Sequence, residues 1–218
     1  MTQIKLNHVK YFIYFGLFSE QYFHKTMTST TPASAPIVRP KTSILDKSLS
    51  RGKQEVSHAA FALLFSEMVQ YAQTRSSTVT DLQQKLHDVG WQVGARIVDV
   101  LCVRDRSSKR ETKLLNVLLM VKSTLWKSLF GKEADKLEHA NDDERTYYII
   151  EKDPLVNKFI SVPKDKGSLN CAAYAAGIIE AVLYGANFPA KVTAHWHKGT
   201  TFMVKFEDHV IARDKGND

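Results

Sequence analysis

Apolar residues in the first half of the chain recur at the spacing of α-helices. Over residues 56–73 they occupy roughly half of a helical wheel, about twice the width of a one-sided surface helix. Residues 79–104 carry a main apolar stripe and a second set opposite, and Thr78 and Asp81 stand where a capping pair would start this helix. A third helix is predicted over 114–130. The first two helices therefore need apolar neighbours on two sides.

The second half shows shorter patterns, typical of strands. Residues 147–151 and 159–162 are rich in β-branched and aromatic side chains and predict two antiparallel strands. Residues 191–198 and 201–206 alternate with period two around a Lys-Gly-Thr turn, which indicates a hairpin. Between these pairs, a helix rich in small residues is predicted over 168–184. Four helices and four strands make this a mixed α/β domain.

A charged connector, residues 132–144, joins the two halves. The Gly131–Lys132 pair at its start lacks the earlier glycine and the following Ser or Thr of a phosphate-binding loop. Its acidic cluster lacks the glycine and the terminal Glu of a calcium-binding loop. We assign the connector no role beyond solvation, and a partner-binding role for it stays open.

Composition adds a constraint on partners. The chain has 218 residues, 44% hydrophobic and 24% charged, which suits one globular domain. Its net charge of +7 is uneven: residues 1–53 hold eight Lys or Arg and two acidic residues, whereas the remainder holds 22 basic and 21 acidic residues. The net charge of residues 54–218 is therefore only +1, which argues against the broad basic face of a nucleic-acid-binding protein.

Two cysteines, Cys102 and Cys171, are too few for a disulfide framework and have no zinc-binding spacing. A reducing compartment is therefore favoured. Cys171, at the start of a predicted helix, could pair with His195 or His197 as a nucleophile and its base. This enzyme hypothesis is one alternative, and a membrane- or nucleic-acid-binding module built on the basic N-terminal segment is another. We predict no catalytic residues, no cofactor and no metal site.

The second apolar set of the 79–104 helix is the best candidate for a functional surface, because monomers seldom expose a large contiguous apolar patch. The alternative is burial under another helix of the same chain. Together with the apolar arc of the 56–73 helix, the set gives eight candidate partner-interface residues: Phe61, Leu64, Phe65, Met68, Trp91, Ala95, Val98 and Cys102.

Several longer stretches resemble the small subunits of the TRAPP (transport protein particle) complexes, in order and without large gaps from about residue 44 to residue 214. The stretches are Glu55–Glu67, Gln92–Arg96, Arg110–Lys113, Trp126–Asp143, Leu169–Ala172 and Phe188–Thr200. Long runs in register are far more specific than a short motif. The resemblance implies the α/β plait of this family, with four or more helices on one side of a four-stranded antiparallel sheet.

The resemblance also implies a function. Relatives are architectural, non-catalytic subunits that dimerise with TRAPP subunit 3 through their first helices and contact subunit 2. The whole assembly is a guanine-nucleotide exchange factor for Rab GTPases and tethers vesicles in ER-to-Golgi and Golgi transport. We therefore expect a cytoplasmic chain at the cis-Golgi and the ER–Golgi interface, associated with membranes only through the complex.

The predicted domain covers residues 44–214. Residues 1–43 are expected to be a variable, largely disordered extension, and 215–218 a short tail. Subunit 3 carries an acylatable cysteine in its first helix, but the 56–73 helix has no cysteine. We expect no lipid modification of this chain.

Overall fold

A computed structural model describes residues 56–104, 111–162 and 167–216. The predicted N-terminal extension, residues 1–43, lies outside the described residues. All described residues belong to one compact unit, Ser50–Asp218.

Helical elements form the first half of the described chain, and two pairs of consecutive strands, separated by two helices, follow them. The helical elements are α2 (His58–Thr74), α3 (Val79–Arg104), α4 (Leu114–Met120), the π-helical segment η2 (Val121–Leu125), α5 (Trp126–Phe130), α6 (Leu155–Lys158), α7 (Ala173–Gly185) and α8 (Asp208–Gly216). The strands are β1 (Lys136–His139), β2 (Thr146–Glu151), β3 (Ala190–Trp196) and β4 (Thr200–Phe206). They form one antiparallel sheet in the order β1-β2-β4-β3.

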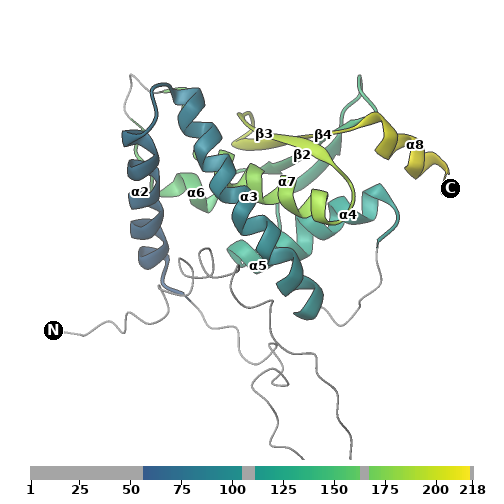
Figure 1. Ribbon diagram of the computed structural model, residues 1–218, viewed down its shortest axis with the longest axis horizontal. Coiled ribbons are helices and arrows are strands. Elements are labelled where there is room, and N and C mark those ends of the chain that lie inside the picture. The colour runs from purple at the N-terminus through teal and green to yellow at the C-terminus, as the bar shows by residue number, and fades with distance from the viewer. Residues whose placement is uncertain (1–55, 105–110, 163–166, 217–218) are drawn as a thin grey trace, which may run out of the picture. The chain divides into compact units, whose positions relative to one another are not determined.

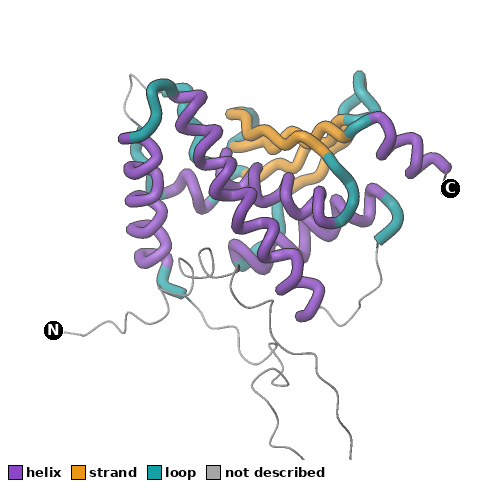
Figure 2. Tube along the Cα trace, in the orientation of Figure 1, coloured by secondary structure: helices purple, strands orange, loops and turns teal. Residues whose placement is uncertain are grey.

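The sheet and the helices form two layers. In Figures 1 and 2, α7 and the α4–α5 segment lie beneath the sheet, and α3 crosses α7. The inward row of the central strands includes Ile149 of β2 and Phe202 and Val204 of β4, all fully buried. Trp126 of α5 packs against Phe202, with the ring centroids 5.2 Å apart. The α/β fold with helices on one side of a four-stranded antiparallel sheet is confirmed.

Local sequence sets the helix ends. The backbone N–H of Asp81 donates to the Thr78 hydroxyl at 3.1 Å, so the predicted cap forms at the start of α3. Ser57 caps α2 in the same way, through the N–H of Ala59 at 3.3 Å. Gly131 ends α5 with a φ of 78°, the left-handed conformation that a helix C-terminus requires and glycine adopts without strain.

Two strand predictions need correction. Residues 159–162 form no strand; they follow the short helix α6. The fourth strand is β1 instead, which lies within the charged connector and pairs with β2 from Lys136↔Ile150 to His139↔Tyr147. Because β1 is a short edge strand with charged side chains, its sequence shows no apolar alternation, and periodicity could not find it.

The helices α3 and α7 cross at backbone contact. A Cβ atom added to Gly177 of α7 would lie 2.0 Å from the carbonyl oxygen of His87 in α3. A Cβ atom on Gly90 would lie 1.9 Å from the carbonyl oxygen of Tyr174. Only glycine fits at these two positions, so the small residues of the helix predicted over 168–184 allow it to pack closely against α3.

The C-terminal helix α8 was not predicted, yet it joins distant parts of the chain. Its Val210 is fully buried. Asp214 accepts a hydrogen bond of 2.7 Å from the backbone N–H of Leu114, the first residue of α4. The Arg213 guanidinium lies 4.6 Å from the centroid of the Phe188 ring. Helix α8 thus caps α4 and covers the segment that leads into β3.

Candidate partner interface

The α2 residues of the predicted interface divide between core and surface. Phe65 is 3% exposed; its ring stacks on that of Phe61 at 5.6 Å and meets the edge of Tyr174 at 5.4 Å. Phe61 and Met68 are half-buried and pack against the core, and Leu64 is also half-buried. Phe65 is therefore a core residue, whereas the other three retain surface that a partner could cover.

The α3 residues lie nearer the surface. Trp91 is half-buried and packs against Tyr184 of α7, with ring centroids 5.5 Å apart. Val98 is half-buried and lies beside Gly185 of α7. Ala95 and Cys102 are exposed. The set is thus only partly buried: Trp91 and Val98 pack against α7, whereas Ala95 and Cys102 face solvent.

The eight predicted interface residues leave out two large exposed side chains near these helices. Tyr184 is 64% exposed beside Trp91, and Tyr71 of α2 is 60% exposed with the Arg75 guanidinium 3.7 Å from its ring centroid. Periodicity could not separate Tyr184 from the small, buried residues of α7, because the helix is apolar all round. Exposed aromatic side chains such as these favour interfaces with other proteins.

The Cys171–histidine pair of the enzyme hypothesis does not assemble. Cys171 is 1% exposed, and burial raises the pKa of its thiol to about 11, the opposite of what a nucleophile needs. His195 and His197 are exposed, and within the described part of the chain no hydrogen bond joins either side chain to Cys171. Cys171 is a small core residue.

No group of three or more metal-ligating side chains lies close enough to hold an ion within the described ranges. No helix among the described residues is long and apolar enough to span a membrane.

The connector carries structural side chains that the sequence did not reveal. Glu151, fully buried at the end of β2, accepts a hydrogen bond of 3.1 Å from the indole N–H of Trp126 and another from Lys132. The hydrogen bond to Glu151 raises the pKa of Lys132. Lys132 therefore stays charged at neutral pH, and its contribution to stability is lost as the pH rises through the raised pKa of the lysine. The Gly131–Lys132 pair thus anchors the turn after α5.

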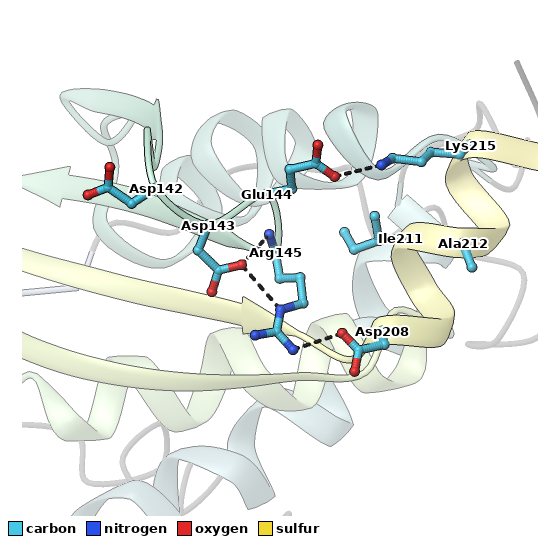
Figure 3. A pocket seen from close by; sticks show the side chains of 8 residues that line it. All are labelled: Asp142, Asp143, Glu144, Arg145, Asp208, Ile211, Ala212 and Lys215. Atoms are coloured by element: carbon cyan, nitrogen blue, oxygen red, sulfur yellow. Dashed lines mark hydrogen bonds and ion pairs between the residues drawn. The ribbon is translucent and has the colours of Figure 1, made fainter.

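A depression of about 460 Å³ lies between the β1–β2 loop and α8, and Figure 3 shows its ion pairs. Arg145 bridges Asp143 at 3.2 Å and Asp208 of α8 at 2.8 Å, and Lys215 of α8 reaches Glu144 at 2.6 Å. The backbone N–H of Arg145 lowers the pKa of Asp143 to about 2. These charges satisfy one another and tie α8 to the loop.

Known proteins resemble this chain over most of its length. The family model described as "Transport protein particle (TRAPP) component" matches residues 61–207. The chain is 60% identical over 181 residues to "Trafficking protein particle complex subunit 5" of Bos taurus, covering 83% of this chain and 96% of the relative. This chain belongs to the TRAPP component family.

Further comparisons agree. The subunit 5 protein of Gallus gallus is 61% identical over 177 residues, which cover 81% of this chain and 94% of that protein. A crystal structure of TRAPP subunit 3 from Naegleria fowleri, covalently bound to palmitic acid, matches with a TM-score of 0.63. It is 15% identical, and the match covers 69% of this chain and 95% of the other. This likeness shows that the fold is shared with TRAPP subunit 3. The resemblance seen in the sequence is confirmed.

Proposed function

We propose that this chain is a non-catalytic structural subunit of a TRAPP vesicle-tethering complex and heterodimerises with TRAPP subunit 3. In this proposal it also contacts subunit 2, and the complex acts as a guanine-nucleotide exchange factor for Rab GTPases in ER-to-Golgi and Golgi transport. The chain would be cytoplasmic, at the cis-Golgi and the ER–Golgi interface, reaching membranes only through the complex. The names of its relatives as complex subunits support this role.

The observation that carries the proposal is the incompletely buried apolar surface of α2 and α3. Trp91 and Val98 are half-buried, while Ala95 and Cys102 are exposed along the same side of α3. Apolar side chains left partly exposed along one side of a helix support a protein-binding role for that side. A standard interface of about 1,600 Å², at roughly 25 cal/mol per Å², has a gross driving force above the association cost of about 4–15 kcal/mol.

Charging the exposed part of this surface tests the interface. We expect Ala95→Glu combined with Cys102→Glu to weaken binding to subunit 3 at least tenfold, because two carboxylates would be buried without partners, each at a cost of about 2 kcal/mol or more. Both positions are exposed in the single chain, so its own fold should persist. Co-purification of tagged subunit 3 with the variant measures the effect.

A matched control adds the same two charges elsewhere on α3. Gln84 and Gln92 are exposed and lie outside the apolar set. Gln84→Glu with Gln92→Glu should leave co-purification at the wild-type level. If the Ala95→Glu, Cys102→Glu chain still recovers subunit 3 as the wild type does, this side of α3 is not the interface.

Deleting residues 1–43 separates the scaffold proposal from a module that works through its basic N-terminus. The interface and the proposed domain, residues 44–214, lie beyond the deleted segment, so we expect the shortened chain to enter the TRAPP complex at full yield. Size-exclusion chromatography of the co-expressed subunits measures assembly. Loss of the chain from the complex peak would contradict the proposal that residues 44–214 are sufficient for assembly.

A further inference from the structure

The sheet has two edge strands, and they differ in length and charge. β1 has four residues, Lys-Glu-His among them, and short, charged edge strands resist pairing with another chain. β3 has seven residues and pairs with β4 in continuous register from Ala190↔Phe206 to Trp196↔Thr200. A strand of this length, with no bulge in its register, can serve as a template for a further strand.

Hydrogen bonds fix which backbone groups of β3 face outward. The N–H of Val192 donates to the Glu180 carboxylate of α7 at 2.7 Å, away from β4. On β4, the backbone N–H of Phe206 donates to the carbonyl oxygen of Arg145 at 2.9 Å, on the β2 side, so Phe206 makes no backbone bond to its β3 partner; the next N–H, of Glu207, donates to Pro189 at 3.4 Å, on the β3 side. Along an antiparallel strand, the backbone N–H and C=O groups of successive residues point to opposite sides, so residues two apart share a side. Ala194 and Trp196 therefore direct these groups away from β4, as Val192 does.

In the described part of the chain, only the first half of the outer edge of β3 has a hydrogen-bond partner for its outward backbone groups. Glu180 occupies the N–H of Val192, but among the described residues the outward N–H groups of Ala194 and Trp196 have no hydrogen-bond partner. Trp196 is also 53% exposed. Neither a proline nor a lysine lies between Val192 and Trp196 to block pairing.

The charge of the β3–β4 hairpin indicates which kind of strand could pair with the free edge of β3. Residues 190–206 contain three lysines and two histidines but no aspartate or glutamate. Lys191 and Lys198 are each 61% exposed, and their carboxylate contacts are long, 3.5 Å to Glu180 and 3.9 Å to Glu138. A second copy of this chain would place two such hairpins side by side and would be repelled. An extended segment with carboxylates at alternate positions would meet Lys191 and His195 on the outer face.

We propose that the free half of β3, centred on Ala194 and Trp196, binds an acidic extended segment of a partner protein as a fifth strand of the sheet. Main-chain hydrogen bonds at Ala194 and Trp196 hold the segment. Its carboxylates face Lys191 and His195, and its opposite side chains pack beside Trp196. This site is separate from the α2–α3 interface of the proposed function and does not depend on it.

A peptide with blocked termini provides a defined probe. Seven residues, with Glu alternating with Val, match the length of β3, and a second peptide carries Lys in place of every Glu. With the full chain, we expect the acidic peptide to bind about tenfold more tightly than the basic one. The amides of Ala194 and Trp196 should then exchange more slowly with solvent. Fluorescence anisotropy and hydrogen exchange measure these two effects.

Ala194→Pro is the decisive variant. It removes an N–H that makes no bond to β4, so the β3–β4 ladder can persist, as prolines do on edge strands. Binding of the acidic peptide should fall about tenfold or more, the effect of losing one main-chain hydrogen bond and its geometry. Ala194→Ser keeps the N–H and should bind as the wild type does.

Three results would overturn the proposal: equal binding by Ala194→Pro and wild type, equal binding of the two peptides, or self-association of the chain through this edge. If Ala194→Pro does not fold, hydrogen exchange of the wild-type chain decides. An Ala194 amide already as protected as that of Thr193, without peptide, would mean that the edge is covered.

Discussion

Gly177→Ala should lower the free energy of unfolding by about 3 kcal/mol or more, at the upper end of what overpacking costs. The added Cβ would lie 2.0 Å from the carbonyl oxygen of His87 and 2.9 Å from the backbone N of Trp91. A clash with a side chain can be relieved by a change of rotamer, but here the colliding atoms belong to the backbone of α3. The two helices must therefore move apart, and the core contacts beside them are lost.

Gly185→Ala is the matched control, since it makes the same change in the same helix. Its Cβ would lie 3.4 Å from the Val98 methyl group, an ordinary contact. Because alanine is the better helix former, stability should stay the same or rise by up to about 1 kcal/mol. Denaturant unfolding followed by circular dichroism compares the two variants. Equal stability of both would show that α3 and α7 do not approach as closely as described.

Glu151→Ala should destabilise the fold by about 2–4 kcal/mol. It leaves the buried indole N–H of Trp126 without an acceptor, and an unsatisfied buried donor costs about 1–3 kcal/mol; the truncated side chain also leaves a cavity. Lys132 adds little to this cost, because its side chain is 53% exposed and water can solvate the freed ammonium group. The same denaturant titration measures the loss.

The control for Glu151 is a second glutamate–lysine pair that is exposed. Glu144 pairs with Lys215 at 2.6 Å, with both side chains largely in solvent. Glu144→Ala should leave the unfolding midpoint unchanged, since exposed ion pairs contribute little. A comparable loss in both variants would mean that burial of Glu151 is not what makes its hydrogen bonds important.

The sequence could predict which apolar residues share one side of a helix, but not which of them belong to the core and which to the surface. The sequence placed Trp91, Ala95, Val98 and Cys102 on one side of a helix, because helical spacing is a local property. It could not tell that Phe65 belongs to the core or that Tyr184 is exposed. Those outcomes depend on α7, which lies some eighty or more residues further along the chain than Trp91 or Phe65.

Local patterns were enough to predict α3 with its Thr78 cap and the β3–β4 hairpin around its turn, and long stretches in register were enough to recognise the family. The other features depend on how the chain packs. β1 forms because β2 offers it an edge, Glu151 is satisfied by Trp126 and Lys132, and Gly177 is required because His87 lies against it. Each of these depends on contacts between residues far apart in the chain, which no local pattern records.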